Sequence, residues 1–569
     1  MTYATVPPNQ EETMPDARVS NTITGRDAFL RVLKDEGVDK MFGNPGTTEL
    51  PIMHALTSAP EMGYVLGLQE AVVIAMADGY ARASGRLVSC NVHVAPGLGN
   101  AIGSIYTSYM SGTPMIVTAG QQEQGHGLTE PLLYAPLVPI AQPVVKWATE
   151  VARIEDLPRI LRRAAKVALT APTGPVFISL PGDILNNEAA IDLGEATRVD
   201  TAVRPTDAAL DQLARRLLAA KNPVILAGHE IATSDAFAEA AELAEVLGAP
   251  VLQQTVSWGA HFPSEHPCYL GALNRDQKRV RQILSDYDLM LCVGADALKM
   301  SVWSEVEPLP PGTAVAMIGL RDWEMGKNFP AEIALRADVK ETLKALVPVL
   351  KKLGGAALAD KARASLASFA TKNWSAQRAQ RLKAVPQPAS GQPLPAEWVM
   401  ARLCEALPAD AVVVDEGLTS ATTLQHYFPY RDRNSFFGNV SGGIGWGIAA
   451  AVGIQLALPR RRVVAVIGDG SAMYSIQALW SAANMKLPVT FLLCNNGGYQ
   501  ILKNRLKLFH GNDKPIGMDF KDPPIDARAL AQGFGVPAER VDSAAAFDAA
   551  LAKSLKSNGP TLIEAMVRS

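Results

Sequence analysis

The sequence predicts an α/β protein of three doubly wound domains, each a parallel sheet covered by helices on both faces. Three observations predict this fold class. Apolar strand-like runs alternate with helix-like runs from residue 25 to the end of the chain. Several of the strand-like runs end in glycine or in a short polar residue, as strands that lead into a helix do. At 569 residues the chain is too long for one hydrophobic core, and two polar stretches interrupt it.

The βαβ rhythm is plainest in the first third of the chain. Thr24 is a candidate N-cap for the first helix. We expect helices over residues 26–37, 70–83 and 100–110, and strands over residues 40–42, 87–92 and 114–119. Short apolar strands separated by helices of this length form parallel sheets.

Two polar, proline-containing stretches, residues 192–206 and 387–395, are candidate linkers. Residues 351–385, rich in Ala, Lys and Arg, are expected to be helical. The first residues carry acids and prolines and resemble neither a signal peptide nor a transit peptide. The expected organisation is a flexible N-terminal arm (1–22) followed by domains at 23–190, 205–350 and 395–569.

Composition and charge exclude several classes of function. The net charge of −3 is small for this length, and no basic patch is interleaved with aromatic residues, so we expect no nucleic-acid partner. Five scattered cysteines favour buried free thiols in a reducing compartment, and we expect a cytoplasmic protein. Residues 442–458 are apolar but short for a membrane span, and their glycines favour a tightly packed helix, so we expect no membrane association.

Oxygen ligands follow two strands in the last third. The strand at 462–467 runs into Gly468, Asp469 and Gly470, and the strand at 487–494 runs into Asn495 and Asn496. Carboxyl ends of parallel strands are where α/β sheets bind ligands. The side chains of Asp469 and Asn496, with the Gly498 carbonyl, form an oxygen set suited to Mg²⁺. The N–H groups of Gly470 and Ser471 can face a diphosphate. The alternative is two ordinary strand-end turns.

Longer motifs carry a family resemblance. They are FGNPGTTELP (42–51), GLQEAVVIAMADGYARASG (67–85), NVHVAPGLGNAIGS (91–104), PMIVTAGQQ (114–122), GPVFISLP (174–181) and GDGSAMYSIQALW (468–480). The chain resembles the thiamine-diphosphate-dependent decarboxylase and acetohydroxyacid synthase superfamily, and within it the benzoylformate decarboxylases. The resemblance covers both outer domains and, more weakly, the middle one. It implies a pyrimidine-binding, a central and a diphosphate-binding domain, in a homotetramer with active sites between subunits.

The resemblance also implies cofactors and site residues. It implies thiamine diphosphate held by Mg²⁺, or by Ca²⁺ in its place, with metal ligands Asp469, Asn496 and Gly498. Glu70 matches the acid that bonds N1′ of the cofactor pyrimidine, and Ile444 matches the bulky residue beneath the bent cofactor. Further cofactor-binding positions are Gly468, Gly470, Ser471 and Thr419. His93 matches a catalytic histidine, and Thr47 stands where the family has a serine that binds the substrate carboxylate.

Some positions depart from the family pattern. The second catalytic histidine is expected after VGA, but this chain reads VGADALKMSVW (293–303), with Ser301 near that place. His126 is a candidate substitute. Gly438 stands where the family has an aromatic residue, and ILKNRLKLFHG (501–511) replaces an apolar helix that lines the substrate site. Arg505 or Lys503 in this segment could reach an anionic or polar substrate. The alternative for these two cations is a solvated surface position.

The expected activity is non-oxidative decarboxylation of a benzoylformate-like 2-oxo acid to an aldehyde through an enamine intermediate. The alternative is a carboligase or lyase that makes or cleaves 2-hydroxy ketones, as acetolactate synthase or benzaldehyde lyase does. The missing histidine favours this alternative, because a slowly protonated intermediate can meet a second carbonyl. A catalytically silent regulatory homologue and a flavin-dependent oxidase remain open. FAD is not expected, because the middle third lacks the three-glycine dinucleotide fingerprint.

Overall fold

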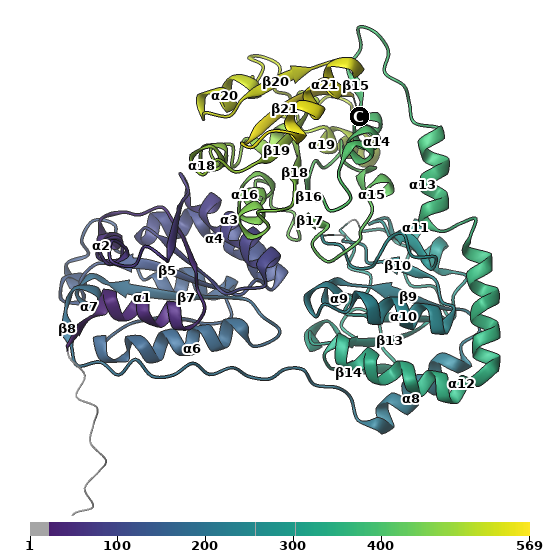
Figure 1. The fold of residues 1–569 in the computed structure, drawn as a ribbon, viewed down its shortest axis with the longest axis horizontal. Coiled ribbons are helices and arrows are strands. Elements are labelled where there is room, and N and C mark those ends of the chain that lie inside the picture. The colour runs from purple at the N-terminus through teal and green to yellow at the C-terminus, as the bar shows by residue number, and fades with distance from the viewer. Residues whose placement is uncertain (1–21, 257, 302, 569) are drawn as a thin grey trace, which may run out of the picture.

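The chain folds into three parallel sheets, each flanked by helices (Figure 1). The structure is a computed structural model and describes residues 22–256, 258–301 and 303–568. The α/β class with three parallel-sheet domains is therefore confirmed. The predicted N-terminal arm falls, except for residue 22, outside the described residues, and the expected domain boundaries stay predictions.

The N-terminal sheet has the strand order β3-β2-β4-β5-β7-β6, all parallel. Its strands are β2 (Lys40–Gly43), β3 (Gly63–Leu66), β4 (Val88–Val92), β5 (Met115–Gln121), β6 (Ala148–Glu150) and β7 (Pro175–Pro181). Its helices are α1 (Gly25–Asp35), α2 (Leu50–Leu56), α3 (Glu70–Ser84), α4 (Val94–Ser111), α5 (Leu137–Ala141), α6 (Leu157–Leu169) and α7 (Gly182–Asn186). Antiparallel pairing of β1 (Ile23–Thr24) with β8 (Glu188–Ala189) joins the two ends of this region.

The central sheet has the order β11-β10-β9-β12-β13-β14, in which the chain reverses direction across the sheet between β9 and β12. Its strands are β9 (Pro223–Ala227), β10 (Val251–Gln253), β11 (Tyr269–Ala272), β12 (Leu289–Val293), β13 (Ala314–Gly319) and β14 (Ile333–Arg336). Its helices are α8 (Asp207–Ala219), α9 (His229–Thr233), α10 (Phe237–Leu247), α11 (Gln277–Leu284) and α12 (Val339–Phe369), which is kinked at Gly355. With α13 (Trp374–Lys383), α12 confirms the helix expected near 351–385.

The C-terminal sheet has the order β15-β21-β19-β18-β16-β17, with β20 paired to β21. Its strands are β15 (Leu394–Pro395), β16 (Val412–Glu416), β17 (Phe436–Gly438), β18 (Val463–Gly468), β19 (Val489–Asn495), β20 (Ala538–Val541) and β21 (Thr561–Arg568). Its helices are α14 (Ala396–Ala406), α15 (Leu424–Tyr427), α16 (Gly447–Ala457), α17 (Asp469–Ala472), α18 (Ala478–Asn484), α19 (Gln500–His510), α20 (Ala527–Gly533) and α21 (Ala544–Leu555).

The glycine-rich segment 442–458 contains α16, which packs against α3 of the N-terminal domain (Figure 1). A Cβ atom on Gly453 would lie 1.8 Å from the Met76 carbonyl oxygen, and one on Gly79 would lie 2.3 Å from that of Ala450. Only glycine permits so close an approach of two helices at these points. Within the described residues, no helix is both long and apolar enough to cross a membrane.

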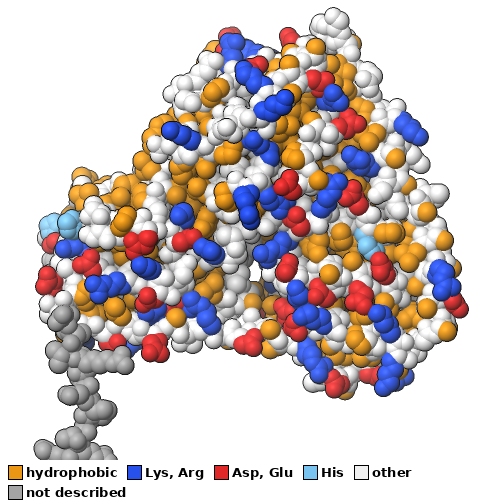
Figure 2. Space-filling model, viewed as in Figure 1, with side chains coloured by type: hydrophobic (Ala, Val, Ile, Leu, Met, Phe, Trp, Pro, Cys, Tyr) orange, Lys and Arg blue, Asp and Glu red, His pale blue; other side chains and the backbone are white. Residues whose placement is uncertain are grey.

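Arg82 joins all three domains at one buried point. Its guanidinium donates hydrogen bonds to the carbonyls of Trp258 in the central domain and Gly438 in the C-terminal domain. It lies 3.5 Å from the Asp78 carboxylate and packs over the rings of Trp258 and Trp446. The indole N–H of Trp446 donates to the same carboxylate. A buried, paired and stacked cation of this kind fixes the relative position of the domains. Elsewhere, Figure 2 shows charges of both signs interspersed over the visible face.

Two buried histidines beside this cluster predict acid sensitivity. His229 and His261 lie with ring centroids 6.4 Å apart, and burial lowers the pKa of each well below the ordinary 6.5. Both ring nitrogens of His261 have no hydrogen-bond partner among the described residues. The unfolded chain therefore binds more protons than the folded one below pH 6.5, and stability should fall as the pH drops through that value. Thermal unfolding between pH 7.5 and 5 should show a smaller fall for His261→Phe than for wild type. An equal loss of stability in wild type and His261→Phe would contradict an origin in the buried His261.

Candidate active site

Asp469 lies at the end of β18, where the backbone of the next strand end surrounds its carboxylate. One oxygen accepts from the N–H of Gly470 (2.8 Å). The other accepts from the N–H groups of Asn496 (3.2 Å), Gly497 (2.8 Å) and Gly498 (3.1 Å). Burial raises the pKa of Asp469, and these N–H donors oppose that rise. As predicted, Asp469 and Asn496 lie together at the ends of two neighbouring strands, β18 and β19.

Two oxygen atoms beside Asp469 are buried and lack a partner among the described residues: Asn496 Oδ1 and Ser471 Oγ. Buried polar oxygens without a hydrogen bond are costly, so each suits a missing ligand. The Gly498 carbonyl accepts from the N–H of Gln500 at 2.9 Å and keeps one lone pair. The described residues hold no cluster of three or more His, Cys, Asp or Glu side chains. A cation here would meet one carboxylate plus amide and carbonyl oxygens, which is a set that fits Mg²⁺.

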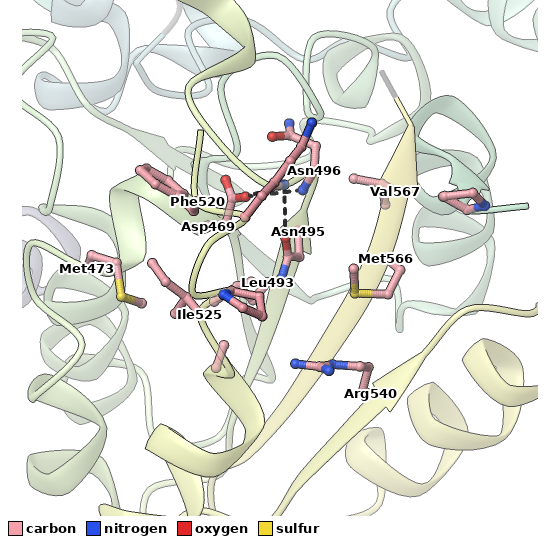
Figure 3. Close-up of a pocket in the computed structure, with 15 residues that line it drawn as sticks. Asp469, Met473, Leu493, Asn495, Asn496, Phe520, Ile525, Arg540, Met566 and Val567 are labelled. Carbon is pink, nitrogen blue, oxygen red and sulfur yellow. Dashed lines mark hydrogen bonds between the residues drawn. The ribbon is translucent and has the colours of Figure 1, made fainter. Parts of the chain in front are cut away.

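A cavity of about 320 Å³ opens beside these residues (Figure 3). Figure 3 shows Asp469 and Asn496 side by side, with Leu493 and Ile525 below them and Arg540 at the far end. Apart from Pro393, all of the lining residues belong to the C-terminal domain. Two short helices, α17 and α18, follow Gly468 and are joined by a turn.

Glu416, at the end of β16, organises the segment that carries Ile444. Its carboxylate accepts from the N–H groups of Gly445 (3.1 Å), Trp446 (3.2 Å) and Gly447 (2.9 Å). Burial raises the pKa of Glu416 to about 7 against the opposing effect of these donors. Ile444 is half-buried. Sequence reasoning missed Glu416, and the only signal for it was an acid at the end of a buried strand.

Thr419 lies in the turn that follows β16 and is half-buried. Its carbonyl accepts a hydrogen bond from the Thr422 hydroxyl. The next residue, Ser420, accepts from the Asn496 amide at 3.4 Å. The predicted positions Thr419, Gly468, Gly470 and Ser471 therefore border the same strand ends as the metal-ligand set.

Glu70 begins α3 in the N-terminal domain, and its side chain meets two asparagines. Asn100 donates to one carboxylate oxygen at 3.1 Å, and Asn44 approaches the other at 3.5 Å. A Cβ atom on Gly97 would lie 3.0 Å from the carboxylate, so glycine there leaves room for it. Glu70 is 8% exposed. A nearly buried carboxylate that keeps room for a further hydrogen bond is suited to bind a donor group of a ligand.

His93 follows β4 and is held by a buried acid that sequence reasoning missed. His93 Nδ1 lies 2.8 Å from Glu49 Oε2 and 3.2 Å from the Thr48 hydroxyl. Because a carboxylate only accepts, this pair places the proton on Nδ1 and leaves Nε2 for other contacts. A Cβ atom on Gly46 would lie 2.0 Å from the ring, so glycine is required beside it. Thr47 is exposed, and it is its neighbour Thr48 that contacts His93.

The two groups of predicted residues lie on different domains. Glu70, His93 and Thr47 are on the N-terminal domain, whereas the metal-ligand set is on the C-terminal domain. Across the described residues, no hydrogen bond or ion pair links one group to the other.

The departures from the family pattern occupy distinct places. Ser301 lines a second cavity, between the domains. Gly438 ends β17, and its carbonyl accepts from Arg82. Lys503 is paired with Asp519 at 2.7 Å, whereas Arg505 has no ion pair to any described residue. His126 is exposed and contacts Thr129.

The crevice of the central sheet, where the strand order reverses, is filled by the chain itself. A Cβ atom on Gly228 would lie 2.1 Å from the Gly294 carbonyl oxygen, so the two strand ends touch. The Glu230 carboxylate accepts from the N–H groups of Leu320 (2.7 Å) and Arg321 (3.3 Å). Nucleotide phosphates bind such backbone donors at this point of an open sheet. Glu230 already uses them.

Comparisons with known proteins agree with this geometry. Models of the thiamine pyrophosphate enzymes match over residues 23–131 (N-terminal TPP binding domain), 210–346 (central domain) and 415–565 (C-terminal TPP binding domain). Benzoylformate decarboxylase of Pseudomonas aeruginosa is 34% identical over 95% of this chain and 98% of its own. The chain belongs to the thiamine pyrophosphate enzyme family. It therefore carries domains that bind thiamine pyrophosphate, which is the thiamine diphosphate predicted above, and it is an enzyme of this family.

Other members of the thiamine pyrophosphate enzyme family are also similar. The acetolactate synthase isozyme 3 large subunit of Escherichia coli is 28% identical over 83% of this chain and 82% of its own. The solved thiamine diphosphate-dependent 4-hydroxybenzoylformate decarboxylase of Rhodococcus jostii RHA1 has a TM-score of 0.85 and 31% identity over 96% of this chain and 99% of its own. A putative thiamin diphosphate-dependent enzyme from Mycobacterium smegmatis has a TM-score of 0.85 and 34% identity, over 96% and 100%.

Glu49 should act through His93. In Glu49→Gln the amide cannot accept from all four groups that the carboxylate now bonds, so the imidazole loses its fixed orientation. We expect kcat to fall about 100-fold, within the range of positioned proton transfer, with KM little changed. The double variant Glu49→Gln/His93→Ala should lose no more than His93→Ala alone. Additive losses would show that Glu49 acts on the fold instead. Exposed Glu155→Gln is the control.

Proposed function

We propose that this enzyme is a thiamine-diphosphate- and Mg²⁺-dependent decarboxylase of 2-oxo acids that releases an aldehyde. One observation carries the choice of decarboxylase: the Glu49–His93 pair, which orients an imidazole with Nε2 available for proton transfer. Releasing an aldehyde requires one proton on the former carbonyl carbon, and a positioned histidine can supply it. The similarity to benzoylformate decarboxylase supports the same choice.

The proposed roles follow from the contacts. Bound thiamine diphosphate would supply the electron sink that accepts the electron pair when carbon dioxide leaves. Asp469, Asn496 and the Gly498 carbonyl would hold Mg²⁺, and the N–H groups of Gly470 and Ser471 would face the diphosphate. Glu70 would hold a proton at N1′ of the pyrimidine. Ile444 and Thr419 would contact the cofactor, and Thr47 would bind the substrate carboxylate.

We also propose that the complete site forms between two copies of the chain, within a homotetramer. Glu70 and His93 on one domain and Asp469 on another are not joined within the described chain, and a second copy would bring them together. Leu128 and Leu132 (95% and 86% exposed) of the N-terminal domain and half-exposed Tyr474 of the C-terminal domain are available to such an interface. The five cysteines are buried and free, which supports a reducing cytoplasmic location.

Product analysis tests the proposed activity. The purified protein, loaded with thiamine diphosphate and Mg²⁺, would be given a panel of 2-oxo acids, and carbon dioxide, aldehyde and 2-hydroxy ketone would be measured. Aldehyde in a one-to-one ratio to carbon dioxide supports the decarboxylase. A 2-hydroxy ketone as the main product would replace it with the carboligase. Turnover of none of the acids, despite cofactor binding, would favour the regulatory homologue.

The carboligase is the second candidate, and Ser301 favours it. A serine in the place expected for a second histidine supplies a weaker proton donor. Slower protonation leaves more time for a second carbonyl to react. A flavin-dependent oxidase would give a yellow protein. We expect a colourless protein, because Glu230 already occupies the backbone N–H donors of the central crevice that a nucleotide would need.

A further inference from the structure

A second cavity, of about 240 Å³, lies where the three domains meet. Its walls come from Met110 of the N-terminal domain, from residues 440–442 of the C-terminal domain, and from Arg275, Lys299 and Ser301 of the central domain. Residues 440–442 lead into Ile444, which is the proposed cofactor contact. Ser301 stands where the second histidine is expected. The cavity therefore lies next to the segment that carries Ile444 and includes the position expected for the second histidine.

The cavity carries positive charge that its own acid does not neutralise. Among the described residues that line it, Asp296 is the only acidic one. The Asp296 carboxylate already lies 3.4 Å from the guanidinium of Arg321 and 3.8 Å from the ammonium of Lys299. Arg275 has no hydrogen bond or ion pair to any residue within the described ranges. With Arg321 balancing Asp296, two cations remain to face the cavity.

Arg505 on α19 adds to this charge. Partial desolvation, and then repulsion from Arg505, lower the pKa of Arg275, while attraction to Asp415 opposes them. Asp415 accepts a hydrogen bond from the N–H of Gly417 at 2.9 Å, and desolvation raises its pKa to about 6. This carboxylate is thus partly committed to the backbone of its own turn. Like charges held near one another favour the binding of an anion.

We propose that this cavity binds a distal carboxylate of the substrate, so that the 2-oxo acid is a diacid. The proposal rests on the proposed decarboxylase function and names its substrate class. The Arg275 guanidinium matches a carboxylate with two parallel N–H donors, and Lys299 adds a point charge. The 2-oxo acid end would then extend toward residues 440–444. A phosphate monoester would use the same cations, and the test separates the two.

The reaction of a diacid balances without a further reactant. The bond between the 2-oxo carboxyl carbon and the carbonyl carbon breaks, and its electron pair passes to the electron sink. A proton then takes the place of the lost carboxyl group. The product is an aldehyde that keeps the distal carboxylate. Nothing is oxidised by an external acceptor.

Kinetics with matched substrates form the first test. Wild-type holoenzyme would be compared on 2-oxo diacids of graded length and on 2-oxo monoacids of the same length. We expect kcat/KM to favour the best diacid by about 10- to 100-fold, the range for a hydrogen bond to a charged group. Arg275→Gln should lower kcat/KM for diacids about 10-fold or more beyond its effect on monoacids. Arg279→Gln, at an exposed position of α11, is the control and should change neither. Equal rates on both classes, or equal losses in Arg275→Gln, would overturn the proposal.

Calorimetric binding to the holoenzyme forms the second test and does not need turnover. A saturated dicarboxylate of the preferred length should bind wild type at least 10-fold more tightly than Arg275→Gln, while the matching monocarboxylate should bind both alike. Tighter binding of an alkyl phosphate than of the dicarboxylate would overturn the carboxylate assignment. If no 2-oxo acid turns over, Arg275-dependent dicarboxylate binding still supports this site while the decarboxylase proposal fails. Absent dicarboxylate binding in an enzyme that decarboxylates monoacids overturns the site alone.

Discussion

Glu70→Gln should lower the decarboxylase activity by about 10²- to 10⁴-fold, the range that positioned acid–base groups contribute. The reason is that glutamine keeps the size of the side chain but can no longer exchange a proton at the pyrimidine N1′. The carboxylate is 8% exposed and accepts from Asn100 at 3.1 Å, so its position is already set by the fold. The loss should appear in kcat with every 2-oxo acid that the enzyme accepts.

The measurement must separate lost chemistry from lost structure. Thermal unfolding and thiamine diphosphate binding should change little in Glu70→Gln, because an amide oxygen can still accept from Asn100. Exposed Glu155→Gln in the same domain serves as the matched control and should retain full activity. Unchanged turnover in Glu70→Gln would contradict the proposed mechanism at its first step.

Asn496→Ala should abolish the stabilisation that thiamine diphosphate and Mg²⁺ give to the folded protein. A ligand at 100 times its Kd stabilises a folded protein by about 2.7 kcal/mol, and a ligand that no longer binds gives nothing. Asn496 is the cleaner target of the metal pair, because its Oδ1 has no partner among the described residues. Asp469→Asn would also disturb the four backbone N–H groups from which its carboxylate accepts hydrogen bonds.

Thermal unfolding with and without the two cofactors measures this effect. Wild type should gain stability with thiamine diphosphate plus Mg²⁺ and lose the gain when EDTA is added. Asn496→Ala should unfold near the wild-type apoprotein in all three conditions, whereas exposed Asn512→Ala should behave as wild type. A full cofactor-dependent gain in Asn496→Ala would remove this residue from the metal site. If the stabilisation of wild type by the cofactors persisted in EDTA, a metal ion would not be part of the site.

Local pattern was enough to predict which elements form and what lies at their ends. The strand expected at 462–467 is β18 (Val463–Gly468), and Asp469 follows it as predicted. The helix expected at 100–110 is longer, because α4 begins at Val94, directly after His93. Proline and glycine at positions 96 and 97 concealed that first turn, since neither favours a helix interior, although proline is tolerated in the first turn.

Partners far apart along the chain could not be predicted in this way. Glu49 and His93 are 44 positions apart, and Glu416 contacts backbone N–H groups about 30 positions later. Thr47 matches a family serine, whereas the hydroxyl that contacts His93 belongs to Thr48. A shift of one position decides which side chain of a short turn faces a ligand, and such a turn carries no periodicity.

The sequence by itself determined the fold class, the family and the placement of Asp469, Asn496 and Glu70 at strand and helix ends, because these depend on hydrophobic period and motif spacing. Only the tertiary structure decided which groups meet across elements and domains. It joined Glu49 to His93, closed the central crevice with Glu230, and set Arg275 beside residues 440–442. Contacts of this kind depend on how whole sheets dock, at separations of a few ångströms, and no local pattern encodes that distance.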